Sequence, residues 1–167
     1  MNSNQWFVIK TNPRAEKIVS KRLHQIGIDN YLPIKRELKQ WKDRKKWVDE
    51  VLLKGYVFIN TTEKLKNEVF KVFGVVRFLY VSGKIAVVSE KEIEILRLFC
   101  EIKNLKIEKK GFEIGDDFEI ISGSLIGMVG KMIVNQKGSK ISIYIAQLGL
   151  FANINISLSD VRKIILD

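Results

Sequence analysis

Two spacings of apolar residues organise the first hundred positions of the chain. Trp6–Lys10 is aromatic and β-branched and then ends in a charge, which predicts a strand. Arg14–Ile26 has apolar residues at helical spacing, which predicts an amphipathic helix packed on a sheet. Asn12 and Pro13 suit the start of this helix, and Gly27 suits its end. The apolar positions of the helix are Ala15, Ile18, Val19, Leu23 and Ile26.

A strongly charged stretch follows and predicts a projecting hairpin. Tyr31–Lys35 reads as a strand leading outward, and residues 35–46 then hold seven basic and two acidic side chains. Ile34 and Val48 flank this stretch, so its charged tip is expected around Lys42–Lys45. Gly55–Ile59 returns as a buried strand opened by a glycine.

The next elements complete an α+β pattern. Thr61 or Thr62 is expected to cap a short helix that runs to Phe70, with Leu65, Val69 and Val72 facing inward. Gly74–Val81 predicts a further strand. Ser89 and Glu92 form a capping box before a helix that reaches about Lys103, with Ile93, Leu96 and either Phe99 or Cys100 as its core positions. The resulting order, with about four sheet strands, predicts a ferredoxin-like α/β sandwich over residues 1–103.

The character of the sequence changes after this domain. Residues 104–111 are rich in lysine, end in glycine and show no period, so they are expected to form a linker. Apolar residues then alternate at Ile141–Ile145 and Ile154–Leu158, and glycines separate the runs. Short strands at this spacing predict a small all-β barrel over residues 112–167.

The net charge of the chain indicates which kind of partner it binds. The chain of 167 residues carries 29 Lys and Arg against 19 Asp and Glu, a formal net charge of +10. This charge favours a polyanion, first nucleic acid and then an anionic membrane, although a basic surface can also serve solubility alone. The single cysteine, Cys100, can form no internal disulfide, and no signal sequence or membrane span is apparent. We therefore expect a cytoplasmic protein without membrane contact.

Catalytic chemistry has little support in the sequence. His24 is the only histidine and lies among basic residues, where a solvated side chain is expected. No cluster has the spacing of metal ligands. The adjacent acids Asp116–Asp117 and Asp49–Glu50 would point to opposite faces of a strand. Gly123–Met132 lacks the spacing of a phosphate loop. We expect no enzyme activity, no cofactor and no metal.

The hairpin is the best candidate for binding nucleic acid. Its cations would neutralise phosphates and give salt-sensitive binding with little sequence choice. Trp41 and Trp47 could stack on unpaired bases or pack across the hairpin, and cross-strand packing is favoured for Trp47. The basic residues are Lys35, Arg36, Lys39, Lys42, Arg44, Lys45 and Lys46.

The strand Gly55–Ile59 has two interpretations. Tyr56 and Phe58 share one face, and Val57 and Ile59 share the other. If helices cover only the second face, then Tyr56 and Phe58 look outward and offer an aromatic patch to a protein. The alternative is an aromatic core strand, which the sequence alone slightly favours.

Three segments in order resemble the N-terminal domain of NusG-like transcription elongation factors: WFVIKTNPRAEKIVSKRL, YLPIKRELKQWKDRKKWVDEVLLKGYVFI and GVVRFL. FEIGDDFEIISGSLIGMVGKMI and LSDVRKI resemble the C-terminal SH3-like KOW barrel of the same factors. The segment Trp41–Trp47 resembles specialised paralogues of UpxY type, which act as antiterminators on capsular polysaccharide operons.

The resemblance implies a transcription elongation and antitermination factor that docks on the clamp coiled coil of RNA polymerase and on nearby DNA. It implies polymerase contacts at Tyr56, Phe58, Phe78 and Val81. It implies contacts with the upstream duplex or the non-template strand at Lys10, Arg14, Lys39, Trp41, Lys42, Arg44, Lys45, Lys46, Asn60, Thr61 and Thr62.

The resemblance is weaker in the barrel. Gly123, Gly127 and Gly130 match the KOW pattern, whereas Ser124 and Ile126 replace a common proline and a common basic residue. In relatives this barrel binds a ribosomal protein or the termination factor Rho, which are the partners expected here for a monomeric chain. A ribosome-associated KOW protein that binds RNA is the alternative function.

Overall fold

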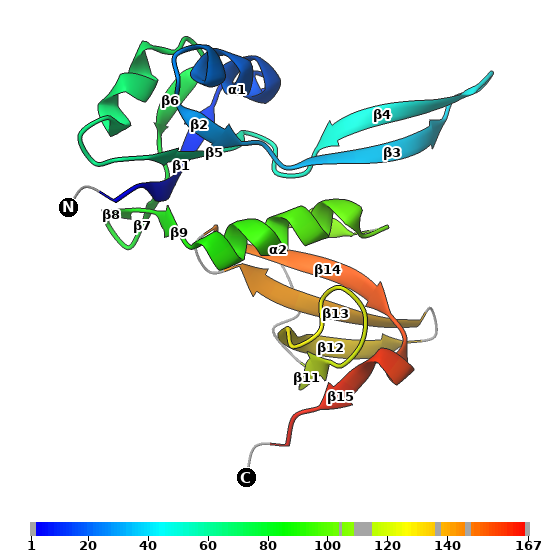
Figure 1. Cartoon of the computed structure of the whole chain (residues 1–167). Coiled ribbons are helices and arrows are strands. Elements are labelled where there is room, and N and C mark those ends of the chain that lie inside the picture. The colour runs from blue at the N-terminus through cyan, green and yellow to red at the C-terminus, as the bar shows by residue number, and fades with distance from the viewer. Residues whose placement is uncertain (1–2, 104, 109–114, 136–137, 146–147, 166–167) are drawn as a thin grey trace. The chain divides into compact units, whose positions relative to one another are not determined.

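The computed structural model describes residues 3–103, 105–108, 115–135, 138–145 and 148–165 (Figure 1). The chain divides into two compact units, Met1–Cys100 and Glu101–Asp167, and each is described on its own. The whole is a mixed α/β fold that consists mostly of sheets.

The first unit is built on an antiparallel sheet whose centre is strand β1. The strands follow the order β2-β5-β1-β6, and the short strand β9 also pairs with β1. β1 is the most buried strand because Phe7, Val8 and Ile9 are all fully buried. The bounds are β1 Gln5–Thr11, β2 Asp29–Tyr31, β5 Tyr56–Thr61, β6 Val75–Phe78 and β9 Val87–Val88.

One face of this sheet packs against α1 (Glu16–Gln25) and the 3-10 helix η1 (Lys66–Lys71). The predicted helix is confirmed, and Gly27 ends it with a φ of 78°. Its predicted start is wrong, because Ala15 occupies the N-cap position without a side-chain bond. Burial also departs from prediction at this face. Val19, Leu23, Val69 and Val72 are buried, whereas Ile18, Ile26 and Leu65 are exposed.

The opposite face of the sheet carries α2 (Glu90–Glu101). The predicted capping box is present: the Ser89 backbone N–H and hydroxyl both donate to Glu92 Oε2 at 2.8 Å. Trp6 Nε1 donates to Glu90 Oε2 at 2.6 Å, and the Tyr31 hydroxyl lies 3.7 Å from Cys100 Sγ. Because Trp6 and Tyr31 lie on this face, the two ends of α2 are fixed to it. The predicted core positions Ile93, Leu96 and Phe99 are buried.

Two hairpins leave the first sheet. Pro33 separates β2 from β3 (Ile34–Gln40), which pairs with β4 (Lys45–Val51) to form the predicted charged ribbon. Figure 1 shows this ribbon extending away from the sheet. The predicted strand Gly74–Val81 is interrupted at Leu79, and its second part joins a small hairpin of β7 (Tyr80–Val81) and β8 (Lys84–Ile85).

In its described residues, the second unit is one antiparallel sheet of six strands in the order β10-β14-β13-β12-β11-β15. Its bounds are β10 Lys106–Glu108, β11 Asp116–Ile120, β12 Val129–Asn135, β13 Gly138–Ile145, β14 Leu150–Ile156 and β15 Val161–Lys163. The 3-10 helix η2, Leu158–Asp160, precedes β15, so the predicted strand position of Leu158 is wrong.

The predicted linker 104–111 needs correction. Its central residues form β10, which pairs with β14 through Lys106↔Asn153 and Glu108↔Phe151. A run of only three residues gains its strand conformation from this pairing rather than from its own pattern. Residues 104 and 109–111 lie outside the described residues.

The interior of the second unit follows the predicted alternation at several of the described positions. Ile141, Ile143 and Ile154 are buried and Tyr144 is exposed, but Ser142 is buried too, and its hydroxyl donates to Asn153 Oδ1 at 2.7 Å. Beside it the strands approach closely, since a Cβ on Gly130 would lie 2.5 Å from the carbonyl oxygen of Ser142. Any larger residue at position 130 would clash with this carbonyl, so the position requires glycine.

Candidate nucleic-acid and protein interface

Glu50 of β4 forms ion pairs with one lysine on the opposite strand of the ribbon and with another lysine just after β4. Lys39 Nζ donates to Glu50 Oε2 at 2.6 Å, and Lys54 Nζ lies 3.7 Å from the other oxygen of the same carboxylate. The hydrogen bond from Lys39 lowers the pKa of Glu50, and the bond to Glu50 raises the pKa of Lys39. Lys39, predicted to contact nucleic acid, is therefore already engaged within the ribbon.

The tip of the ribbon concentrates unpaired positive charge. The backbone N–H of Trp41 donates to the carbonyl of Arg44 at 2.8 Å and closes the turn. Within the described part of the chain, none of the exposed tip cations forms an ion pair with a carboxylate. These cations are Lys42, Arg44, Lys45 and Lys46, so the structure brings together the core of the predicted nucleic-acid set.

Both tryptophans of the ribbon remain largely exposed. Trp41 lies at the turn with 59% of its surface exposed. Trp47 lies directly opposite Leu38, as cross-strand packing predicts, yet 56% of it is exposed. The Arg36 guanidinium lies 5.6 Å from the centroid of the Trp47 ring. Neither ring is packed into the hydrophobic core.

The structure separates the two aromatic residues of β5. Phe58 is fully buried and packs beside Tyr31, whereas Tyr56 is half-buried. Phe58 pairs with Val8 and Tyr31 in the sheet, between the two points at which α2 is fixed. The prediction that Phe58 offers a surface contact is therefore wrong, because α2 covers this part of the face.

Beyond α2, a basic and aromatic row crosses three strands. Lys10 is the cross-strand neighbour of both Tyr56 and Arg77, and its Nζ lies 5.7 Å from the centroid of the Tyr56 ring. Arg77 is exposed. The structure thus joins Lys10, predicted to bind nucleic acid, to the predicted polymerase contact Tyr56. Arg77 was missed because only strand register reveals its place in this row.

The second segment predicted to contact polymerase, Phe78–Val81, also contains one buried and one exposed predicted contact. Phe78 is buried, with edge-to-face contacts to Phe7 and Phe70 at centroid distances of 6.0 and 5.5 Å. It belongs to the core under η1 and not to the surface. Val81 and its neighbour Tyr80 are 39% and 52% exposed, so this small hairpin keeps an apolar surface.

The residues around Asn60 that were predicted to contact unpaired DNA mostly form bonds within the protein or are buried. Asn60 donates to Asp29 at 3.2 Å, and Thr61 is buried. The carbonyl of Thr62 accepts bonds that start η1. The prediction of Thr61 as a surface contact is therefore wrong, because this last residue of β5 is buried. Arg14 is exposed in the turn before α1, with a left-handed φ of 62°.

Two further observations concern the described residues only. They contain no group of three or more His, Cys, Asp or Glu side chains that could hold a metal ion. They also contain no helix long and apolar enough to cross a membrane.

Comparison with known proteins identifies the class to which this arrangement belongs. The family described as "Transcription termination factor nusG" matches residues 4–97, more than half of the chain. The chain is thus a transcription factor of the termination and antitermination class. It belongs to the NusG family.

Two individual proteins are similar to this chain. The chain is 26% identical over 176 residues to the transcription termination/antitermination protein NusG of Rickettsia bellii, covering 97% of this chain and 91% of that protein. The solved structure titled "Domain interaction in Thermotoga maritima NusG" is 23% identical, with a TM-score of 0.59 and 98% of each chain covered. The second match shows the likeness of fold alone.

Proposed function

We propose that this protein is an antitermination factor that binds the clamp coiled coil of RNA polymerase and the adjacent DNA. The sheet end with Lys10, Tyr56 and Arg77, together with Val81, faces the clamp, and the ribbon faces the upstream duplex or the non-template strand. Bridging the two favours the closed, elongating state of polymerase, which is a shift of populations and needs no bond-breaking chemistry. Suppressed pausing then suppresses termination.

The projecting ribbon is the observation that carries this proposal. Its tip cations are exposed and have no ion-pair partner in the described structure, so phosphates can take that place at little desolvation cost. The half-buried Tyr56, with Lys10 beside its ring and Arg77 on the next strand beyond Lys10, supports a second, separate partner, because tyrosine and arginine are enriched at protein interfaces.

Finer features of the proposal rest on the resemblance in sequence. They are a ferredoxin-like NusG N-terminal domain over residues 1–103, a KOW barrel over 112–167, and a UpxY-type role on capsular or surface polysaccharide operons. The barrel would bind a ribosomal protein or Rho. The protein would act in the cytoplasm as a monomer.

The DNA half of the proposal is tested at the ribbon tip. Changing Lys42, Arg44, Lys45 and Lys46 together to alanine should weaken binding to duplex DNA and reduce the slope of log K against log salt by up to about 3.6, because each phosphate contact contributes roughly 0.9. Filter binding across a salt series measures this. Lys91→Ala, an exposed charge on α2, is the control. Unchanged affinity and slope in the tip variant would reject the ribbon as the DNA contact.

The polymerase half is tested at the sheet end. Tyr56→Ala combined with Arg77→Ala should abolish capture of purified RNA polymerase while the circular dichroism spectrum stays native. Tyr144→Ala, an exposed tyrosine of the second unit, is the matched control. Retained capture by the double variant would contradict the proposal. Recovery of ribosomal particles without polymerase from the wild-type protein would support the alternative, a ribosome-associated RNA-binding protein.

A further inference from the structure

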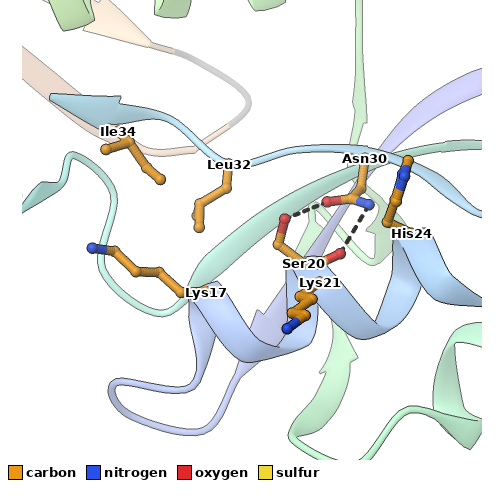
Figure 2. A pocket seen from close by; sticks show the side chains of 7 residues that line it. All are labelled: Lys17, Ser20, Lys21, His24, Asn30, Leu32 and Ile34. Carbon is orange, nitrogen blue, oxygen red and sulfur yellow. Dashed lines mark hydrogen bonds between the residues drawn. The ribbon is translucent and has the colours of Figure 1, made fainter. Parts of the chain in front are cut away.

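The exposed surface of α1 has two flanks of different character. Lys17 and Lys21 lie on the flank that borders the segment between β2 and β3, where they line a groove (Figure 2). Ile18, Arg22 and Ile26 are spaced four residues apart, so they form a row along the other flank. This row extends about 12 Å along the helix, at a rise of about 1.5 Å per residue. One flank is therefore cationic, and the other presents two aliphatic side chains around an arginine.

Phe73, just after the 3-10 helix η1, lies against this row. The Arg22 guanidinium lies 5.7 Å from the centroid of the Phe73 ring, and its Nη1 donates to the Phe73 carbonyl at 2.9 Å. The carbonyl of the next residue, Gly74, accepts a bond from the backbone N–H of Asn12 at 2.9 Å. A Cβ on Gly74 would lie only 2.8 Å from Val19 Cγ2, so the chain passes closely over α1. The backbone that carries the Phe73 ring is thus fixed on the helix.

We call Ile18, Arg22, Ile26 and Phe73 the α1 patch. Its apolar members are largely exposed, with 48% of Ile18, 52% of Ile26 and 79% of Phe73 open to solvent. Aromatic residues and arginine are enriched at protein interfaces, and apolar area is concentrated at the interface centre. A ring whose backbone is already fixed loses little conformational freedom when a partner covers it. The patch therefore has the composition and the rigidity of a protein-binding surface.

The charges around the α1 patch complement an acidic partner. Glu16, the acid of α1, is buried and accepts a backbone bond at 2.6 Å. In the part of the chain that the structure describes, neither Lys21 nor Arg22 forms an ion pair. On η1, Glu68 is paired with Lys71 at 2.5 Å, so its charge is already balanced. The charge left for a ligand at this patch is positive.

We propose that the α1 patch binds an amphipathic α-helix of a partner protein, one with an apolar stripe flanked by carboxylates. The stripe packs beside Phe73 and along the row of α1, as the ridges of one helix pack into the grooves of another. The carboxylates pair with Arg22 and Lys21. An extended peptide would gain its main-chain bonds only at a sheet edge, and the patch lies on a helix and a turn.

Two other occupants fit this surface less well. A second copy would bring the same cations against each other, between chains that each carry a formal net charge of +10. A nucleic acid would use Lys21 and Arg22 but would gain little from Ile18 and Ile26, because bases stack on flat rings rather than on branched aliphatic side chains. The partner that uses both the apolar and the charged groups is an acidic amphipathic helix.

This inference does not rest on the proposed function. The α1 patch belongs to the layer that covers one face of the sheet, whereas Lys10, Tyr56 and Arg77 lie on the face that carries α2. Tyr56→Ala combined with Arg77→Ala should therefore leave helix binding at the patch unchanged. Loss of polymerase capture and loss of helix binding are separate outcomes, each with its own variants.

The first test measures binding of the full chain to a labelled synthetic helix of about 20 residues, long enough to be helical on its own. The helix carries leucines at positions i, i+3, i+4 and i+7, with glutamates on both sides of them. Phe73→Ala should weaken binding, measured by fluorescence anisotropy, by about tenfold, as truncation of a central aromatic anchor does. Ile165→Ala, which removes an equally exposed side chain (79%) from the second unit, is the control. Urea denaturation should show both variants as stable as the wild type.

The second test examines charge. A helix with lysines in place of the glutamates should bind the wild-type protein at least tenfold more weakly, because its cations face Arg22 and Lys21. Lys21→Glu should weaken binding of the glutamate helix several-fold and strengthen binding of the lysine helix. Lys91→Glu, an equivalent change at an exposed position of α2, should leave both affinities nearly unchanged.

Four results would overturn the inference. The first is equal binding of the glutamate helix by Phe73→Ala and Ile165→Ala, and the second is equal binding of the two helices by the wild-type protein. The third is a dimer in sedimentation velocity that Phe73→Ala disperses, which would assign the patch to a second copy. The fourth is competition by oligo(dT) as effective as competition by the unlabelled glutamate helix, which would assign the patch to nucleic acid.

Discussion

At the scale of single residues, Tyr56 and Phe58 show how two positions of one strand face come to differ. The strand pattern correctly predicts that they point the same way. Their burial depends on α2, which begins more than thirty positions later and is fixed at Trp6 and near Tyr31. No local pattern states where a distant helix stops, so the sequence leaves both interpretations of this strand open.

Replacing these two side chains should have very different effects on stability. Phe58→Ala removes a fully buried ring and should lower the free energy of unfolding by about 3–5 kcal/mol. Tyr56→Ala, at a half-buried position, should lower it by less than half of that and serves as the control. Urea denaturation followed by circular dichroism measures both. Equal losses would show that the two rings share one environment.

At the scale of elements, the sequence best predicted those features that depend on residues close together in the chain. The capping box, the end of α1 at Gly27 and the pairing of the ribbon were all correct, because each follows from residues a few positions apart. The prediction of a linker at residues 104–111 was wrong because β10 forms by pairing with β14, some 45 positions away in the sequence.

The ion pair between Lys39 and Glu50 makes the ribbon respond to pH. The pKa of Glu50 is lowered from its ordinary value of 4.5, so the pair stabilises the folded ribbon above that value and is lost as pH falls through the lowered pKa. The pKa of Lys39 is raised from 10.5, so the same contribution is present below that value and is lost as pH rises through the raised pKa.

We therefore expect Lys39→Met to move the titration midpoint of the Glu50 carboxyl upward toward 4.5. Carboxyl carbon shifts in an NMR pH titration report this midpoint directly. Lys46→Met removes the neighbouring cation on the same face and should shift it far less, since Lys46 has no ion pair with Glu50 in the structure. A midpoint that is the same in the wild type and in Lys39→Met would show that the pair does not form in solution.

At the scale of the whole molecule, the two units can be followed separately because the chain's tryptophans, Trp6, Trp41 and Trp47, all lie in the first. Gly130→Ala should destabilise the second unit by about 1–3 kcal/mol, since the added Cβ meets the Ser142 carbonyl between β12 and β13. For a unit of this size the melting temperature should fall by at least several degrees.

Thermal melts of Gly130→Ala test this. The circular dichroism transition of the second unit should move to lower temperature, while the tryptophan fluorescence transition stays in place. Lys140→Ala, an exposed change on β13, should leave both in place. A fluorescence transition that moves together with the circular dichroism transition would show that the two units unfold as one.

The two-stranded ribbon has one more consequence. Its outer edges carry backbone groups that no third strand of the described structure satisfies, and such edges attract strands from other molecules. Lysine and arginine along both strands keep like ribbons apart by mutual repulsion. The charges that would recruit a nucleic acid thus also protect the protein from self-assembly, and a neutralised ribbon is expected to aggregate at concentrations that the native one tolerates.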